Sequence, residues 1–309
     1  MKKVFIDGRE GTTGLRIYDR LKDRKDIQLI VLEEKDRKNA KCRKQAINQS
    51  DITILCLPDE AAKESVAMVE NENTIIIDCS TAHRVQSGWV YAFPELYKNF
   101  DEIVKNNKRF AVPGCHASGV IALIKPLIQK GVLKNDAPIS CTSVTGYSGG
   151  GKKMIADYQS EDKNELLDFP RQYAISLKHK HLREIKEIAG LAQTPLFMPI
   201  VGNFYSGMQV CIAIYKNFLA DGKSIEDIKN VYKNMYTSEI VFYTEDNENG
   251  FISSGVLAGK DSMSISVFGE EERILLVARY DNLGKGASGA AVECLNYILG
   301  ENKATGLEL

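Results

Sequence analysis

The sequence predicts an α/β protein in two parts, a parallel sheet with helices on both faces followed by an α+β domain. Short apolar runs alternate with helically spaced segments through the first third of the chain. The middle of the chain instead carries strand-like runs, several of them with period-two alternation. The 309 residues also exceed what one core usually holds, so two domains are expected.

In the first third, apolar strands are expected at residues 3–6, 28–32, 52–57, 74–78 and 110–112, with a helix at 13–21. Pro58 ends the third strand, and Asp59 is expected to cap a helix that runs to about Val69. Strands separated by helices in this way favour a parallel sheet.

In the second part, strands are expected at 139–145, 196–199, 208–215, 240–243, 263–267 and 274–280, and helices at 152–160, 181–189 and 224–235. The alternation in several of these strands is typical of half-buried antiparallel pairs. The chain is expected to end in a helix of small residues at 285–299.

The composition excludes several classes of partner. Hydrophobic residues make up 44% and charged residues 26%, and the net charge of -1 offers no field that would favour nucleic acid or a membrane surface. No stretch approaches the roughly 18 apolar residues that a membrane span needs. The short apolar run at the start does not predict a secretory signal, so a cytoplasmic location is expected.

The seven cysteines are scattered without CxxC spacing, which predicts neither a disulfide framework nor a zinc site. Cys56, Cys141 and Cys211 lie in apolar runs and are expected to be small buried hydrophobes. Cys115 stands in different surroundings, described below.

A glycine-rich loop follows the first strand and opens a helix. Gly8, Gly11 and Gly14 are spaced G-x-x-G-x-x-G, and Thr12 and Thr13 stand at the expected helix start. Glycines there allow the main chain to approach a pyrophosphate, which the helix N-terminus attracts, so this loop is predicted to bind a dinucleotide.

The choice between NAD and NADP stays open at the residue level. The second strand runs into Glu33-Glu34-Lys35-Asp36-Arg37-Lys38. An acidic residue there favours a free ribose hydroxyl, hence NAD. Lys35, Arg37 and Lys38 could instead hold a 2′-phosphate, hence NADP, and a solvated charge run is a third interpretation.

Cys115 lies in a Pro-Gly turn between a short strand and an apolar helix. A helix N-terminus stabilises a thiolate and lowers its pKa, and its free N–H groups can hold an oxyanion. We therefore predict that Cys115 is a nucleophile. The adjacent His116 is expected to orient the turn or to pack.

A nucleophilic cysteine needs a group that moves protons. His179 and His181 stand at the expected start of a helix, and without a third ligand at metal spacing they favour acid–base chemistry over metal binding. The loop that contains Ser148 is a candidate anion cradle. Arg84, in the segment that begins with Ser80 at a strand end, could clamp a carboxylate or phosphate.

At these residues the chain resembles the shorter form of the N-acetyl-gamma-glutamyl-phosphate reductase family, and the likeness runs nearly the whole length. The segments that carry it are FIDGREGTTG (5–14), CLPDEAA (56–62), STAHR (80–84), GWVYAFPEL (88–96), PGCHASG (113–119), GYSGGGK (146–152), HKHLREI (179–185) and DNLGKGASGAAV (281–292).

The resemblance implies a Rossmann-type dinucleotide-binding domain (1–114 and 285–309) and an α+β catalytic and dimerisation domain (115–284) like that of semialdehyde dehydrogenases. It implies NADPH-dependent reduction of N-acetyl-L-glutamyl 5-phosphate to the 5-semialdehyde, with phosphate release, in arginine biosynthesis. Cys115 would form a thioester, and His181 or His179 would move the proton. A homodimer or homotetramer is implied, with an acyl phosphate as its small-molecule partner and no metal.

The resemblance also extends the set of expected site residues. Asn282 and Ser80 are expected at the cofactor with the glycine loop, and the expected substrate contacts are Arg84, Ser118, Ser148 and Glu184. The chain departs from the family pattern at three positions: His116 stands for the usual aromatic residue, Ser118 for threonine, and Arg183 for proline. The last departure bears on the local loop geometry.

Two alternatives accompany this interpretation. Aspartate-semialdehyde dehydrogenase shares the architecture and the cysteine chemistry, and differs mainly in substrate. A dinucleotide-sensing protein without catalysis is the alternative from another class, against which Cys115, His179 and His181 argue.

Overall fold

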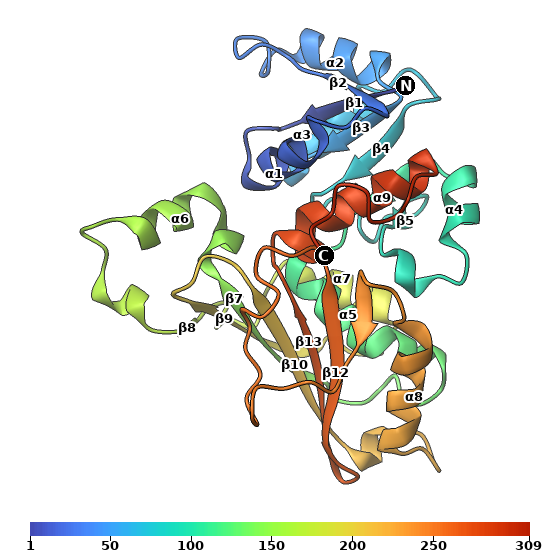
Figure 1. Cartoon of the computed structure of the whole chain (residues 1–309), viewed down its shortest axis with the longest axis vertical. Helices are drawn as coiled ribbons and strands as arrows, with labels where there is room; N and C mark the ends of the chain where they lie inside the picture. Colours follow the sequence, from blue (N-terminus) through green and yellow to red (C-terminus); the bar gives the residue numbers. More distant parts are fainter. The chain divides into compact units, whose positions relative to one another are not determined.

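The computed structural model describes residues 1–309 as two compact units. Unit 1 comprises Met1–Gly114 and Ala287–Leu307, and unit 2 comprises Cys115–Gly286 with Glu308–Leu309. Most helices and strands of both are labelled in Figure 1. The predicted architecture, a parallel-sheet domain followed by a mixed α+β domain, is confirmed.

Unit 1 is built on a parallel sheet in the order β2-β1-β3-β4-β6-β5. Its strands are β1 (Lys2–Asp7), β2 (Ile27–Ile30), β3 (Ile52–Leu55), β4 (Ile75–Asp78), β5 (Val90–Tyr91) and β6 (Arg109–Ala111). Its helices are α1 (Thr12–Leu21), α2 (Ala40–Gln49), α3 (Asp59–Ala67), the 3₁₀ turn η1 (Pro94–Leu96), α4 (Phe100–Asn106) and α9 (Gly289–Leu299).

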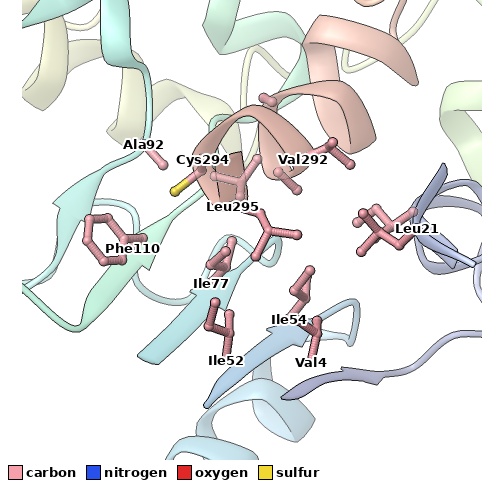
Figure 2. Packing of buried hydrophobic residues seen from close by; sticks show 14 of the residues in the cluster. Val4, Leu21, Ile52, Ile54, Ile77, Ala92, Phe110, Val292, Cys294 and Leu295 are labelled. Atoms are coloured by element: carbon pink, nitrogen blue, oxygen red, sulfur yellow. The ribbon is translucent and has the colours of Figure 1, made fainter. Parts of the chain in front are cut away.

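The alternation of side chains along the strands places helices on both faces of this sheet. Val4 packs in one cluster with Ile17 of α1 and Leu295 of α9, whereas its neighbour Phe5 packs with Ile47 of α2 on the opposite face. Figure 2 shows strand side chains such as Ile54 directed at α9. Burying each such aliphatic side chain contributes about 1.5–3 kcal/mol, so the last helix of the chain is part of the core of unit 1.

Two local expectations for unit 1 are corrected. Asp59 does not cap α3, because Pro58 is the N-cap residue. The Asp59 carboxylate instead accepts hydrogen bonds from the main-chain N–H of Thr81, at 2.9 Å, and from the Thr81 hydroxyl. The last helix does not start as an α-helix at Lys285, because Gly284–Ser288 forms a π-helical turn (η5) before α9 begins at Gly289.

Unit 2 has a mixed sheet in the order β11-β12-β13-β10-β7-β9-β8. Its strands are β7 (Ser140–Gly146), β8 (Arg171–Gln172), β9 (Leu196–Gly202), β10 (Met208–Tyr215), β11 (Val241–Tyr243), β12 (Met263–Glu270) and β13 (Arg273–Tyr280). Its helices are α5 (Cys115–Gln129), α6 (Gly151–Gln159), α7 (His181–Ala189) and α8 (Ile225–Met235), with 3₁₀ turns η2 (Tyr147–Gly150), η3 (Glu165–Asp168) and η4 (Lys216–Phe218).

The pairing in this sheet corrects the antiparallel expectation in part. β12, β13, β10 and β7 are antiparallel neighbours, but β7 pairs with β9 and β11 pairs with β12 in parallel. Period two shows that a strand has one buried face, but it does not determine the direction of its neighbour.

Helix α5 is the structural centre of unit 2. It packs against α7, α8, β10 and β13, and most of its residues are buried on every side. A helix that is apolar all round belongs in the interior. Because Cys115 is its first residue, the head of this helix is held by contacts along its whole length.

All seven cysteines are free. Cys141 is buried as expected, whereas Cys56 and Cys211 are only half-buried, so that expectation is wrong for these two. No helix is long and apolar enough to cross a membrane.

Candidate active site

Cys115 stands where the chain turns from an extended segment into α5. Its side chain is half-buried, and the residues on either side of it are buried. The main-chain N–H groups of a first helical turn have no partner within the helix, and they favour negative charge close by. The position suits a thiolate and, after attack on a carbonyl, an oxyanion.

A tyrosine hydroxyl fixes the first turn of this helix. The Oη of Tyr280, at the end of β13, donates to the carbonyl of Cys115 at 2.6 Å and accepts from the N–H of Gly119 at 3.1 Å. These two main-chain groups are four residues apart, so the hydroxyl is inserted into the hydrogen-bond ladder of the helix. Gly119 leaves room for it, because a Cβ there would lie 2.7 Å from the hydroxyl.

His116 is enclosed by aromatic rings and uses both of its nitrogens. Its Nδ1 lies 2.7 Å from the Ser143 hydroxyl, and its Nε2 lies 2.6 Å from the Tyr173 hydroxyl. Burial, followed by the nearby charges of His179 and Lys180, lowers the pKa of His116 to about 3. The imidazole is therefore neutral at physiological pH, and its hydrogen bonds go well beyond simple packing.

The two predicted acid–base histidines join the same cluster. The ring of His116 lies 5.7 Å from that of His179 and 5.8 Å from that of His181, and the latter two are 4.8 Å apart, all measured between centroids. His181, the first residue of α7, is buried, and its main-chain N–H donates to Nδ1 of His179 at 3.2 Å. The histidine pair is thus anchored to the residue next to Cys115.

The remaining predicted residues of unit 2 are buried. Ser118 lies in the first turns of α5, and Glu184 lies on α7, which packs against α5. Asn282 and Ser148 are brought together: the Asn282 amide donates to the Ser148 hydroxyl at 3.0 Å and accepts from the N–H of Gly207 at 3.0 Å. This pair fixes the turn before α6 against the segment that follows β13.

In unit 1, Gly8 at the start of the glycine loop lines a cavity of about 680 Å³, whereas Gly11, Thr12, Thr13 and Gly14 are not among its lining residues. Gly8 has φ +86°, and a Cβ on it would lie 2.4 Å from the carbonyl oxygen of Cys56. A Cβ on Gly14 would lie 2.5 Å from the carbonyl oxygen of Gly8. Helix α1 starts at Thr12, followed by Thr13, with Gly11 as N-cap and no side-chain cap bond. Glycine is thus required at two of the three predicted positions, as in a phosphate-binding turn.

The lining of this cavity carries charges of both signs, from Arg9, Arg37, Lys38 and Arg43 and from Asp7, Glu10 and Glu34. Residues 29–32 of β2 and the segment after it line the cavity together with Arg9, Arg37 and Lys38. The guanidinium of Arg37 forms ion pairs with Glu34, at 2.9 Å, and with Glu10. A guanidinium in the segment that follows the second strand has the chemistry to bind a 2′-phosphate of an adenosine ribose. The residues present therefore fit a dinucleotide.

Ser80 and Arg84 both form hydrogen bonds to other residues of unit 1. The Ser80 hydroxyl donates to the Asp78 carboxylate at 2.7 Å, which also binds His83 at 2.6 Å. The Arg84 guanidinium donates to the carbonyls of Val112 and Cys79, at 2.9 and 3.1 Å. Arg84 therefore stabilises the carboxyl ends of the strands, whatever further contacts it makes.

Three residues of the site were not found from the sequence. Ser143, Tyr173 and Tyr280 stand outside the recognised segments, although Tyr280 directly precedes one of them. No group of three or more His, Cys, Asp or Glu side chains in the structure could hold a metal ion.

Comparison with protein-family models defines the class. A model described as semialdehyde dehydrogenase, NAD binding domain, matches residues 3–104, and one described as semialdehyde dehydrogenase, dimerisation domain, matches residues 115–282. The chain is therefore an enzyme of the semialdehyde dehydrogenase class. The crystal structure of aspartate semialdehyde dehydrogenase II from Vibrio cholerae covers 97% of this chain and 99% of its own, with a TM-score of 0.73 at 16% identity. That likeness concerns the fold alone.

Curated relatives narrow the class. N-acetyl-gamma-glutamyl-phosphate reductase from Sinorhizobium medicae is 43% identical over 305 residues, covering 96% of this chain and 98% of the relative. N-acetyl-gamma-glutamyl-phosphate reductase 2 from a Nostoc species is 41% identical and covers 99% of each chain. The chain belongs to the N-acetyl-gamma-glutamyl-phosphate reductase family.

Proposed function

We propose that the protein reduces N-acetyl-L-glutamyl 5-phosphate with NADPH to N-acetyl-L-glutamate 5-semialdehyde and phosphate, a step of arginine biosynthesis. The observation that carries the proposal is the position of Cys115, at the head of a buried helix and one residue from a cluster that contains both predicted acid–base histidines. The names of the relatives support the substrate.

The reaction proceeds through a thioester on Cys115. The thiolate attacks the acyl carbon, an S–C bond forms, and the C–O bond to phosphate breaks with its electrons leaving on phosphate. When bound, a nicotinamide cofactor would supply the hydride for reduction of the thioester. A histidine protonates the resulting oxygen to give a thiohemiacetal and then takes that proton back, so that the C–S bond breaks and the aldehyde leaves. Such splitting replaces one difficult step by easier ones.

We assign the proton transfer to His181, with His179 as its support. Burial and the charge of Lys180 lower the pKa of His179 to about 4, whereas an acid–base group works best with a pKa near the operating pH. The Nδ1 of His179 already accepts from the His181 main chain. His181 stands at the start of α7, in ring contact with His116.

The cofactor proposal names the residues that would hold NADPH. Gly8, Gly11, Thr12, Thr13 and Gly14 would accommodate the pyrophosphate at the start of α1. Arg37, with Arg9 and Lys38, would bind the 2′-phosphate in the cavity that Gly8 lines. Ser80 and Asn282 complete the proposed cofactor set, and Arg84, Ser118, Ser148 and Glu184 form the proposed substrate set.

The proposal extends to organisation. Residues 1–114 and 285–309 are assigned to dinucleotide binding, and 115–284 to catalysis and self-association, which the division into two units supports. We propose a homodimer or homotetramer; the description of the matching family as a dimerisation domain supports self-association. A cytoplasmic location remains a prediction.

The test offers the purified enzyme N-acetyl-L-glutamyl phosphate and, separately, L-aspartyl phosphate, each generated by its kinase, and follows NADPH oxidation. The relatives named for the first substrate cover 96% and 99% of this chain. We expect kcat/KM to favour that substrate by at least about 100-fold, because a site built to bind the N-acetyl group would be left with unpaired polar groups by L-aspartyl phosphate. Cys115→Ala should lose turnover with either substrate while it binds NADPH like the wild type. Equal use of both substrates, or turnover by Cys115→Ala, would refute the proposal.

A further inference from the structure

The imidazole of His116 has an environment that its position in the sequence does not explain. It is 3% exposed, and its ring packs against Phe197, His179 and His181. Both nitrogens have hydroxyl partners within 2.7 Å, contributed by β7 and by the residue that follows β8. A ring that only filled space would not need two polar partners from distant segments.

Only two hydrogen-bond arrangements are available to this group. A neutral imidazole has one N–H and one acceptor nitrogen, and a serine or tyrosine hydroxyl can either donate or accept. In the first arrangement Ser143 donates to Nδ1, and Nε2–H donates to the Tyr173 oxygen, which leaves the Tyr173 proton available. In the second, Tyr173 donates to Nε2, and its proton is used up.

The surroundings of Tyr173 favour the first arrangement. The Tyr173 oxygen lies 2.6 Å from Nε2 of His116, the residue next to Cys115. Burial, followed by the negative charge of Cys115, raises the pKa of Tyr173, so its hydroxyl stays protonated. Its main chain is fixed, since its N–H donates to the carbonyl of Pro199 at 3.0 Å. A protonated hydroxyl close to a thiolate is stabilised when it donates to that charge.

We propose that His116 is a positioning residue whose Nε2–H holds the Tyr173 oxygen, so that the Tyr173 hydroxyl donates a hydrogen bond to the Cys115 thiolate. Ser143, His116 and Tyr173 then form a chain of donors that ends at the nucleophile. It stabilises the thiolate before attack and again when the thiohemiacetal collapses. The inference rests on the proposed function only in taking Cys115 as the nucleophile.

Other charged or titratable groups share these surroundings and must be kept constant in any test. His179, Lys180, His181 and Glu184 come from α7 and the turn before it, and Tyr280 comes from β13. The test therefore changes only His116 and Tyr173.

The experiment measures how fast iodoacetamide alkylates Cys115 as a function of pH, with the modified peptide quantified by mass spectrometry. It needs neither substrate nor NADPH, so it reports on this inference even if the proposed substrate is wrong. In Tyr173→Phe we expect the pH of half-maximal rate to rise by about one unit, the size expected for one hydrogen bond to a charged group. His116→Phe should show a similar rise, and the double variant should show no more than either single variant.

Two further variants sharpen the result. Tyr236→Phe removes a different tyrosine hydroxyl of unit 2, a buried one bonded to the Ala122 carbonyl at 2.7 Å, and should leave the midpoint unchanged. His116→Gln keeps an amide N–H able to reach Tyr173 and should restore most of the wild-type midpoint. If His116→Phe does not fold, Tyr173→Phe and His116→Gln decide. A wild-type midpoint in Tyr173→Phe, a His116→Gln midpoint raised like that of Tyr173→Phe, or additive shifts in a folded double variant would overturn the proposal.

Discussion

The hydroxyl of Tyr280 bridges the Cys115 carbonyl and the Gly119 N–H, and Tyr280→Phe removes it without changing the ring. The hydrogen bond to the Gly119 N–H is buried, and the one to the carbonyl of the half-buried Cys115 is partly buried, so water cannot replace the lost partner of Gly119. If the helical turn closes and the Cys115 carbonyl bonds the Gly119 N–H directly, the free energy of unfolding falls by about 1 kcal/mol. If both groups stay without a partner, each lowers it by about 1–3 kcal/mol. We expect an intermediate loss of about 3 kcal/mol.

The matched control is Tyr236→Phe. It also removes a buried hydroxyl that bonds the main chain of α5, but through one hydrogen bond and away from Cys115. Residue 126 is a proline and has no N–H to serve the buried Ala122 carbonyl within the helix, so a loss of about 2 kcal/mol is expected there. For a domain of this size each kcal/mol lowers the melting temperature by about 2–4 °C, so Tyr280→Phe should melt about 6–12 °C below the wild type and Tyr236→Phe about 4–8 °C below it.

Activity separates the two variants further. A direct hydrogen bond between the Cys115 carbonyl and the Gly119 N–H would draw Cys115 closer to Gly119. A misplacement of a catalytic group by about 1 Å can lower the rate on the order of 100-fold. We expect kcat of Tyr280→Phe to fall at least about tenfold and that of Tyr236→Phe to stay close to the wild type, measured by NADPH oxidation well below both melting temperatures. Equal melting temperatures for the two variants together with a wild-type kcat in Tyr280→Phe would refute the reasoning.

Three more predictions concern the cofactor cavity and the histidines. Gly8→Ala should raise the Kd of NADPH at least about tenfold in a fluorescence titration, because the new Cβ would lie 2.4 Å from the Cys56 carbonyl oxygen. The control is Gly88→Ala, which should not raise the Kd, because Gly88 has a similar φ of +81° but no atom within 4 Å of the new Cβ. Equal affinities of the two variants for NADPH would contradict this. Arg37→Ala should raise the Kd of NADPH by about tenfold and change the Kd of NADH little. Lys35→Ala, which removes a neighbouring exposed charge, is the control and should change neither Kd. An equal loss of affinity for both cofactors in Arg37→Ala would argue against a contact with the 2′-phosphate. The free energy of unfolding should decrease as the pH is lowered from about 6.5 to about 4. In this range the unfolded chain binds a proton at His179, whereas native His179, with its pKa lowered to about 4, does not. Urea titrations should show a smaller decrease in His179→Asn, and an unchanged pH dependence in that variant would be inconsistent with a neutral native imidazole.

Much of the fold could be predicted because its signals are local. The alternation in β1 and its neighbours reports two buried faces, and Gly8 and Gly14 report a turn with no room for a Cβ. Helix α2 was not predicted, since only Ala46 and Ile47 are buried in its otherwise polar sequence. β9 continues past Pro199, where it was expected to end, because Ile200, Val201 and Gly202 still pair with β7.

The interior of the candidate site depends on contacts that leave no local pattern. His116 bonds Ser143 and Tyr173, 27 and 57 residues away, and Tyr280 bonds Cys115 across 165 residues. Local chemistry could indicate that Cys115 heads a helix, but it could not show which hydroxyls surround it. The histidine beside it was for the same reason expected only to orient the turn or to pack.

The most direct test of the central claim, a Cys115 thioester formed from an acyl phosphate, runs the reaction backwards. Purified enzyme is given N-acetyl-L-glutamate 5-semialdehyde and NADP⁺, with and without inorganic phosphate, and NADPH is followed by absorbance. We predict steady turnover only when phosphate is present to cleave the thioester, and none in Cys115→Ser, which should still bind NADP⁺. Steady NADPH formation at the same rate without phosphate, or by Cys115→Ser, would contradict the account.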